Sequence, residues 1–236
     1  MPSEDRIGYL GLIPARAGSK GIPGKNVVDL GGRPLIRWTI DAALASERLD
    51  HVLLSSDDED AMQVAREAGV DVPFSRPEEL AGDRSSMVDV VLHAVDFISR
   101  RDAVELETVV LLQPTSPFRD SGDIDVAVAA FEAAGADRLV SVSPPHQHPC
   151  DMVAMSDGGL EWAVPHPDGA AGRQDFPRYF FVNGAIYITR LDALRRDRVF
   201  ESPDSAVHVM DPSHSVDIDD ELDLALARGL LLEPRP

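Results

Sequence analysis

The most informative part of this sequence is Leu12-Ile-Pro-Ala-Arg-Ala-Gly-Ser-Lys-Gly-Ile-Pro-Gly-Lys-Asn26. It continues from an apolar run, residues 9–13, that is typical of a buried strand. It holds three glycines together with Arg16, Lys20 and Lys25. Glycines let a backbone approach a ligand closely, and exposed N–H groups with nearby cations attract phosphate oxygens. The stretch therefore predicts a strand followed by a polyphosphate-binding loop; the alternative is a flexible basic surface loop.

Two common nucleotide-binding motifs do not fit this loop. A Walker A loop has a glycine five residues before its Gly-Lys pair and a Ser or Thr after the lysine. This chain has Ser19 and Asn26 at those two positions. The dinucleotide pattern G-x-G-x-x-G does not occur here either. A P-loop kinase is therefore disfavoured.

Composition limits the class of protein. The chain has 236 residues, 44% of them hydrophobic, which is enough for one large α/β domain with a sizeable core. Its formal net charge of −19 repels nucleic acid and anionic membranes, so neither is an expected partner. Cys150 is the single cysteine, which excludes an internal disulfide and fits a reducing compartment. We expect a cytoplasmic protein, because the N-terminus is unlike a signal peptide and no apolar run reaches the ~20 residues of a membrane span.

Strand-like apolar runs alternate with helix-like stretches along the chain. The expected strands cover residues 9–13, 51–54, 108–112, 138–142 and 183–188, and the expected helices cover 34–45, 57–68, 87–98, 123–134 and 221–228. This alternation predicts an α/β fold with a mostly parallel sheet and helices on both faces. Residues 144–180 interrupt the pattern, because they are rich in proline and have no long helix. We expect a single domain over residues 1–236, with an irregular excursion at 144–180 such as a hairpin arm used in dimerisation.

Ligands of parallel α/β sheets bind at the carboxyl ends of the strands. The opening loop and three other polar segments fall at such places, namely residues 55–58, 113–119 and 215–220. Asp217 and Asp219 are two residues apart, so their carboxylates share one side of an extended segment. Paired carboxylates suit Mg²⁺ bound to substrate phosphates. The alternative is that Asp219 or Asp220 caps the final helix.

Other residues carry less specific signals. Gln113 can recognise a hydroxyl or amide of a substrate, or it can satisfy the backbone of a proline-rich turn. Arg76 and Arg119 can bind an anion, although an exposed arginine is usually only solvated. The histidines have no metal-ligand spacing, which disfavours a zinc site. The residues alone indicate an enzyme that handles a nucleotide or sugar phosphate with Mg²⁺, and they name neither the base nor the acceptor.

Residues 13–26 closely resemble the signature of the acylneuraminate cytidylyltransferases, also called CMP-sialic acid synthetases. The resemblance continues in order through five further blocks: Arg76-Pro-Glu-Glu-Leu80, Leu112-Gln-Pro-Thr-Ser-Pro-Phe-Arg119, Arg173-Gln-Asp-Phe-Pro177, Asn183-Gly-Ala-Ile-Tyr-Ile188 and Asp217-Ile-Asp-Asp-Glu-Leu-Asp-Leu224. Six ordered blocks over nearly the whole chain make the signal highly specific. One departure is Ala17, where the family commonly has a second glycine; it matters only if the position needs a positive φ.

The resemblance implies a Rossmann-like nucleotidyltransferase fold in a homodimer. It implies that CTP activates a nonulosonic (sialic-type) 2-keto sugar acid, giving the CMP-sugar and pyrophosphate. The implied nucleotide-binding residues are Ala15, Arg16, Gly18, Ser19, Lys25 and Asn26, with Arg76 and Ser85 at the cytosine. The implied sugar-acid contacts are Gln113, Arg173 and Asn183, and the implied ligands of Mg²⁺, or of another divalent cation, are Asp217 and Asp219. The residues expected to be catalytic are Arg16, Lys25, Gln113, Asp217 and Asp219.

Two alternatives stay open at this point. One keeps the fold and CTP but changes the acceptor to a Kdo-like acid or a phosphonate, and residues 144–180 would decide between these acceptors. The other is a non-catalytic nucleotide- or sugar-binding homologue. Retention of Lys25, Gln113, Asp217 and Asp219 argues against the second alternative.

Overall fold

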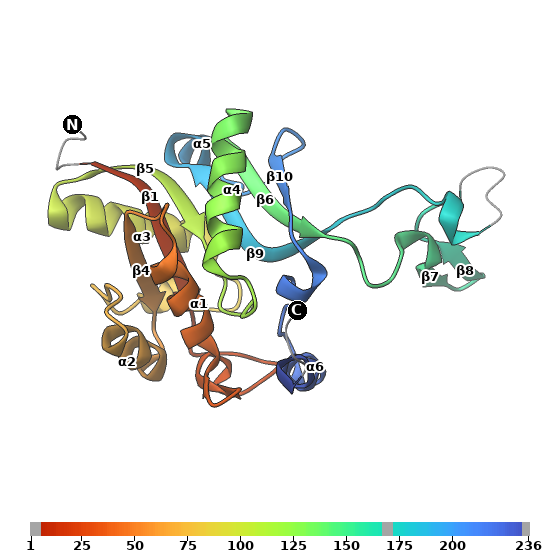
Figure 1. The fold of residues 1–236 in the computed structure, drawn as a ribbon, viewed down its shortest axis with the longest axis horizontal. Coiled ribbons are helices and arrows are strands. Elements are labelled where there is room, and N and C mark those ends of the chain that lie inside the picture. The colour runs from red at the N-terminus through yellow and green to blue at the C-terminus, as the bar shows by residue number, and fades with distance from the viewer. Residues whose placement is uncertain (1–5, 167–171, 233–236) are drawn as a thin grey trace.

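A central sheet of six strands organises the computed structural model, which describes residues 6–166 and 172–232. The strand order is β10-β6-β9-β5-β1-β4. The strands are β1 (Arg6–Ala15), β4 (His51–Ser56), β5 (Glu105–Leu111), β6 (Arg138–Ser143), β9 (Phe181–Arg190) and β10 (Ala206–Val209). All pairs are parallel except those of β9, which runs antiparallel to both of its neighbours. The predicted α/β fold with a mostly parallel sheet is confirmed (Figure 1).

Helices cover both faces of this sheet, as the sequence predicted. One core cluster joins it to α1 (Leu35–Ala45), α2 (Glu59–Glu67) and α4 (Ser121–Ala134). A second cluster on the other face joins it to α3 (Met87–Asp102) and α5 (Leu191–Asp197). None of the helices in the described ranges combines the length and apolar character needed to cross a lipid bilayer.

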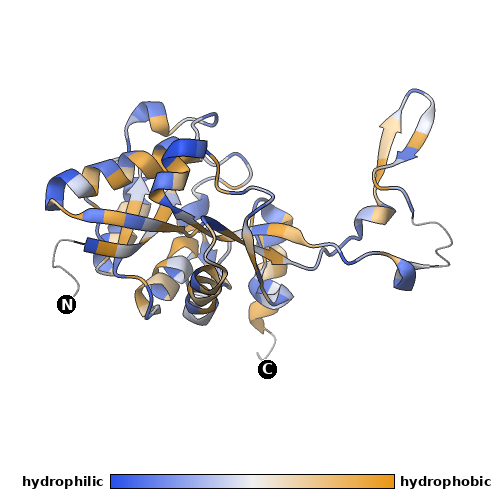
Figure 2. Ribbon diagram, turned by 90° about the horizontal axis from the view of Figure 1, so that it is seen from above, coloured by the Kyte–Doolittle hydropathy of each residue, from blue (hydrophilic) through white to orange (hydrophobic). Residues whose placement is uncertain are grey.

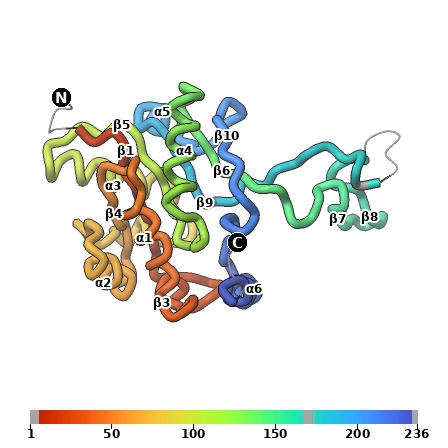
Figure 3. Tube along the Cα trace, in the orientation of Figure 1, coloured from red at the N-terminus to blue at the C-terminus, as the bar shows by residue number. Residues whose placement is uncertain are grey.

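A third, smaller core cluster ties the start of the chain to its C-terminal helix. The opening loop leads into η1 (Lys25–Val27) and a short hairpin, β2 (Asp29–Leu30) and β3 (Arg33–Pro34). The helix α6 (Glu221–Leu232) packs beside this hairpin (Figure 3). Ile22, Phe118 and Ile218 lie fully buried or nearly so within this cluster. Segments from three distant parts of the sequence therefore meet at one edge of the domain.

An arm leaves the sheet at the end of β6 and returns at the start of β9. Its described part contains η3 (Pro149–Asp151), η4 (Arg173–Asp175) and a hairpin of β7 (Val153–Ser156) with β8 (Gly159–Trp162). The hairpin projects away from the body of the molecule, although several of its residues are hydrophobic (Figure 2). The arm occupies the range in which the sequence predicted an excursion. That residues 1–236 form one domain stays a prediction.

Sequence patterns did not find every element. The direction of β9 is hidden, because the chain reaches it from β6 through the irregular arm rather than through a crossover helix. The helix α5 has seven residues, too few for a clear 3.6-residue period. The edge strand β10 has four residues, of which Val207 and Val209 are exposed. Short elements at an edge carry too little hydrophobic pattern to be recognised.

Candidate active site

Side chains from neighbouring elements hold both ends of the opening loop. Asn26 is buried, and its side-chain amide donates to the carbonyl oxygen of Arg16 at 2.9 Å and to Asp58 Oδ2 at 3.0 Å. Asp58 also caps α2 by accepting from the Ala61 N–H. The Ala17 N–H donates to Asp57 Oδ1 at 3.0 Å. The loop therefore has a fixed path across the carboxyl ends of β1 and β4.

A cleft of about 210 Å³ lies beside this loop. Most of the residues that the sequence singled out meet there, although they come from four separate segments of the chain. The cleft is lined by Pro14, Arg16, Ser19, Lys25, Asn26, Arg76, Met87, Gln113, Pro114, Thr115 and Asp219. The loop, the end of β5 and the segment before α6 thus form one site.

The acidic segment before α6 is held against the loop by backbone and side-chain bonds. The Ile218 N–H donates to the Thr115 carbonyl at 2.8 Å. Lys25 Nζ lies 3.0 Å from the Ile218 carbonyl and 3.1 Å from Asp219 Oδ1. Asp223 Oδ2 accepts from the N–H groups of both residues 219 and 220. Lys25 therefore bridges the two halves of the site.

Gly21 marks the closest approach of the loop to this segment. A Cβ atom at this position would lie 2.0 Å from the Asp219 carbonyl oxygen, far inside van der Waals contact. Only glycine fits between these two backbones. The sequence predicted that the glycines of this loop allow close approach to a ligand, whereas the structure shows that Gly21 allows close approach to the backbone of Asp219.

Asp217 has the environment of a metal ligand. Burial raises the pKa of its carboxyl, and a hydrogen bond from Thr115 opposes this shift. Its Oδ1 is buried and has no hydrogen-bond partner among the described residues. A buried carboxylate oxygen without a donor is costly unless something else satisfies it. The nearby carboxylate of Asp219, which adds to the upward pKa shift, makes a divalent cation a chemically suitable partner.

Arg76 lines the cleft together with Met87 of α3, whereas Ser85 is not among the lining residues. Arg76 is 5% exposed and donates through Nε to Ser55 Oγ at 3.2 Å and through Nη2 to the Ser55 carbonyl. Burial lowers the pKa of Arg76 to about 10, so its guanidinium stays charged at neutral pH. Ser85 follows η2 (Glu78–Leu80) and donates to the Glu79 carbonyl at 3.0 Å. Arg76 thus presents a fixed cationic plane to the cleft.

A second pocket of about 480 Å³ adjoins the cleft, and Met87 and Gln113 line both. Its other lining residues are Val88, Leu111, Tyr187, Arg198, Val199, Phe200 and Glu201. The rings of Tyr187 and Phe200 pack with their centroids 5.9 Å apart. Sequence analysis missed this pocket, because its residues share no motif and come together only through tertiary packing.

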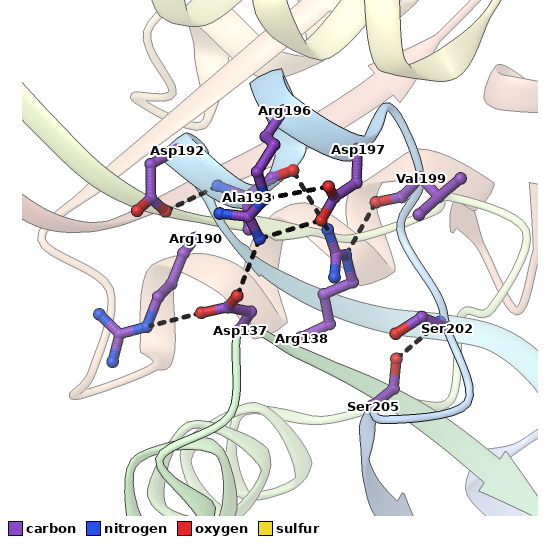
Figure 4. Close-up of polar contacts among 10 residues, drawn as sticks. All are labelled: Asp137, Arg138, Arg190, Asp192, Ala193, Arg196, Asp197, Val199, Ser202 and Ser205. Atoms are coloured by element: carbon purple, nitrogen blue, oxygen red, sulfur yellow. Dashed lines mark hydrogen bonds and ion pairs between the residues drawn. The ribbon is translucent and has the colours of Figure 1, made fainter.

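A network around Arg138 holds one wall of the second pocket (Figure 4). The Arg138 side chain is buried and donates to the carbonyls of Val199 and Ala193, each at 3.1 Å, and to Asp197. Arg196 adds exposed pairs to Asp137 and Asp197. The segment that carries Val199 and Phe200 into the pocket is therefore anchored to the start of β6.

Two of the residues expected at the sugar acid lie apart from the cleft. Asn183 is buried; its Oδ1 accepts from Ser141 Oγ at 2.6 Å and its Nδ2 donates to Ser215 Oγ at 3.1 Å. Arg173 begins η4 in the arm, and its side chain lies outside the described part of the structure. A Cβ at Gly184, the neighbour of Asn183, would lie 3.8 Å from Gln113 Nε2, but the Asn183 side chain itself bonds to Ser141 and Ser215. The assignment of Asn183 and Arg173 to the sugar acid stays a prediction.

A separate group of possible metal ligands lies at the start of α4. Single ligand atoms of Asp120, Asp123 and His214 lie within 4.8 Å of one another. Both carboxylates already take part in the capping box of α4, and His214 Nδ1 lies 2.8 Å from Asp123 Oδ2. Helix capping therefore accounts for this cluster.

Comparison with known proteins places the chain in a family. Residues 10–153 match a family model described as Cytidylyltransferase. The chain belongs to the cytidylyltransferase family. It is 37% identical over 225 residues to the CMP-N,N'-diacetyllegionaminic acid synthase of Legionella pneumophila, covering 94% of this chain and 95% of the relative. It is 34% identical over 210 residues to the N-acylneuraminate cytidylyltransferase of Streptococcus agalactiae serotype V, covering 88% of this chain.

The chain covers only part of some relatives, and it shares its fold with a solved structure. The chain spans only 49% of the Streptococcus agalactiae protein, about half the length of several curated relatives it matches. A solved CMP:2-keto-3-deoxy-manno-octonic acid synthetase complexed with CTP superposes with a TM-score of 0.69 at 18% identity, over 95% of this chain and 98% of that one. This neighbour supports a Rossmann-like nucleotidyltransferase fold for the cytidylyltransferase chain.

The family match does not cover the whole site of this cytidylyltransferase. It includes the opening loop, Arg76 and Gln113 but ends at residue 153. Asp217 and Asp219 lie beyond it. Their place in the site rests on the contacts of Lys25 and Thr115 with the acidic segment.

Proposed function

We propose that this cytidylyltransferase transfers the CMP group of CTP to a nonulosonic 2-keto sugar acid and releases pyrophosphate. The observation that carries the proposal is the cleft in which the cations of the opening loop meet the carboxylate of Asp219 before α6. The adjoining second pocket gives the acceptor a place beside the nucleotide. The names of the relatives, an N-acylneuraminate cytidylyltransferase and a CMP-N,N'-diacetyllegionaminic acid synthase, agree with this substrate class.

The nucleotide lies along the opening loop in this proposal. The backbone and side chains of residues 15–19, with Lys25 and Asn26, hold the triphosphate and ribose. Arg76 and Ser85 contact the cytosine. Support comes from the anchoring of the loop by Asn26 and from the fixed, charged guanidinium of Arg76 at the cleft.

The acceptor occupies the second pocket. The volume of this pocket suits a small ligand, and its mostly apolar lining with a few polar groups is typical of small-molecule sites. Gln113 lies at the junction of the two cavities, where it can orient a polar group of the sugar acid. Leu111, Val199 and Phe200 offer apolar surface to acyl or methyl substituents.

Asp217 and Asp219 hold Mg²⁺ or another divalent cation. The unpartnered Oδ1 of Asp217 supports this assignment. When bound, such a cation neutralises charge on phosphate oxygens. Asp223 fixes the backbone of Asp219 and so keeps its carboxylate close to Lys25.

The reaction is an in-line displacement at the α-phosphorus. The anomeric hydroxyl oxygen of the sugar acid forms a bond to this phosphorus while the bond to the pyrophosphate breaks. The hydroxyl proton passes to solvent. Arg16 and Lys25 stabilise negative charge on the phosphate oxygens, and Gln113 orients the acceptor. Positioning and fixed charges therefore supply most of the catalysis.

A second copy of this chain is the proposed protein partner, and the cytoplasm is the proposed location. Every residue of the β7–β8 hairpin is exposed, and Met155 has 81% of its surface accessible. Leu160 and Trp162 are also exposed large apolar side chains. Apolar surface on a projecting hairpin favours burial against another protein. The buried free thiol of Cys150 agrees with a reducing compartment.

The combined change Met155→Glu and Leu160→Glu is expected to convert the dimer to a monomer. Two charges on the apolar hairpin cannot be buried without a large desolvation cost. Light scattering after size-exclusion chromatography measures the mass. Val126→Glu, on an exposed position of α4, is the control that keeps the dimer. A hairpin variant of unchanged mass would contradict the assignment of the arm.

Arg138→Met is expected to weaken sugar-acid binding selectively. The variant loses the bonds that anchor the segment of Val199 and Phe200, so we expect the KM for the acid to rise about three- to tenfold. The KM for CTP should stay within about twofold of the wild-type value, because the opening loop does not contact the network around Arg138. Steady-state kinetics with each substrate varied measure both constants. Arg196→Met removes only exposed pairs and serves as the control; a parallel rise in both KM values would contradict this prediction.

Pyrophosphate release tests the proposed function. Each of the four NTPs is paired, in the presence of Mg²⁺, with N-acetylneuraminate, the deaminated nonulosonic acid, pseudaminate, legionaminate or Kdo. Release that requires both CTP and one nonulosonic acid supports the proposal and names the acceptor. Release with Kdo alone, or with another NTP, would contradict it.

A further inference from the structure

Asp83 lies opposite the opening loop, in the turn between η2 and α3. Its carboxylate contacts two cations of the loop at once: one oxygen pairs with Arg16 Nη1, and the other lies 2.5 Å from Lys20 Nζ. The two cations flank the backbone of residues 17–19. Sequence analysis gave no role to Asp83, because a single acidic residue in a polar turn carries no signal.

We propose that Asp83 is an internal counter-ion that competes with the nucleotide for the cations of the opening loop. In the nucleotide-free protein its carboxylate takes a place that phosphate oxygens take in the complex. Binding of the triphosphate displaces Asp83 from Arg16 and Lys20. Asp83 thereby sets the affinity for CTP, and this inference rests on the proposed function.

The charges around the loop support this competition. Lys25 is partnered by Asp219 and by the Ile218 carbonyl. Arg16 and Lys20 have the same anionic partner, Asp83, and their contacts hold the pKa of its carboxyl below the ordinary value, with Lys20 the larger cause. The carboxylate is therefore ionised at neutral pH and is able to neutralise cations that would otherwise repel one another.

The exposure of these pairs makes them easy to exchange. The Lys20 side chain is 78% exposed and that of Asp83 is 41% exposed. Exposed ion pairs contribute little to stability, whereas a triphosphate offers several charged oxygens to the same cations. The nucleotide therefore displaces Asp83, but its affinity is lowered because the contacts of Asp83 with Arg16 and Lys20 must break.

The turn that carries Asp83 also carries a residue proposed to contact the base. The Ser85 N–H donates to the Gly82 carbonyl at 3.1 Å, and Ser85 Oγ donates to the Glu79 carbonyl. Asp83 lies within this tight turn. Displacement of Asp83 from the loop therefore takes place in the same turn that holds Ser85.

Titration calorimetry with two ligands tests the inference. Inorganic tripolyphosphate and CTP are titrated into the wild-type chain, Asp83→Asn, Lys20→Met and the double variant at low ionic strength. We expect Asp83→Asn to bind both ligands about three- to tenfold more tightly, since two exposed pairs no longer compete. We expect at least half of this gain to disappear in the Lys20→Met background, because Asp83 then has one cation fewer to occupy.

Asp96→Asn is the matched control. Asp96 forms an exposed pair with Arg195, so its loss changes the net charge by the same amount without touching the loop. No gain in Asp83→Asn, an equal gain in Asp96→Asn, or a gain that is undiminished in the Lys20→Met background would overturn the inference. A wild-type chain that binds tripolyphosphate but not CTP would instead overturn the proposed function, while the tripolyphosphate titrations still decide the role of Asp83.

Discussion

Asp217→Asn is expected to lower kcat by about 10³-fold or more without destabilising the fold. Asparagine keeps the shape of the side chain but loses the charge that makes Asp217 a ligand for a divalent cation. The charge is costly to bury, as the raised pKa of this carboxyl indicates. Without divalent metal, the variant should therefore melt at the same temperature as the wild-type chain or at a higher one.

Thermal melting with and without Mg²⁺ separates the effect of Asp217 on metal binding from its effect on the stability of the fold. A cation that binds the folded chain raises the melting temperature by mass action, so we expect an upward shift in the wild type and none in Asp217→Asn. Glu221→Gln is the control, since Glu221 lies exposed in the first turn of α6 and its change removes the same charge. Equal metal-dependent shifts in the wild type and Asp217→Asn would contradict the assignment of Asp217 as a ligand.

Gly21→Ala is expected to lower kcat/KM for CTP by about 10²-fold. The added Cβ would lie 2.0 Å from the Asp219 carbonyl oxygen, so the loop and the acidic segment must move apart. A displacement of about 1 Å within a catalytic site can cost this much in rate. In the wild-type chain Lys25 Nζ lies 3.1 Å from Asp219 Oδ1. In the variant these two side chains would no longer act on the same phosphate chain.

A second glycine provides the control for this change. Gly229 lies within α6 and has open space where its Cβ would be. Gly229→Ala should leave the kinetics unchanged and stabilise the chain by about 0.5–1 kcal/mol, because alanine favours the helix. Kinetics and urea unfolding measure both variants. Wild-type kinetics in Gly21→Ala would show that the two backbones need not touch for activity.

The parts of the fold that sequence could predict are those with strong local patterns. The apolar run before Arg16, the helix that starts after Asp58, and the polar segments after β4 and β5 all follow directly from residue order. Asp217 and Asp219 could be chosen because their two-residue spacing has a chemical meaning. Comparison with known proteins then supports the family that the ordered blocks indicated.

The parts of the fold and of the site that the sequence did not predict depend on contacts between residues far apart in the chain. Tyr187 and Phe200 line a pocket only because β9 and the segment after α5 pack together. Asp83 meets Lys20 across 63 positions of sequence, and no local pattern records that approach. The sequence predicted that both carboxylates of the acidic pair share one side, but their surroundings differ: Asp217 is half-buried with its Oδ1 inaccessible to solvent, whereas the Asp219 side chain is 75% exposed.

The third core cluster has a consequence for how the protein forms during translation. Ile218 and Leu224, which share a core cluster with Ile22 of the opening loop, are synthesised about 200 residues after it. At typical rates of synthesis this delay lasts about 10–40 s. The pairs β1–β4 and β1–β5 can form in the meantime, whereas β9 and β10 join the sheet only shortly before Ile218 is made. The cleft is incomplete until the segment before α6 has docked against the loop. The sheet and the cleft are therefore both completed by the C-terminal fifth of the sequence.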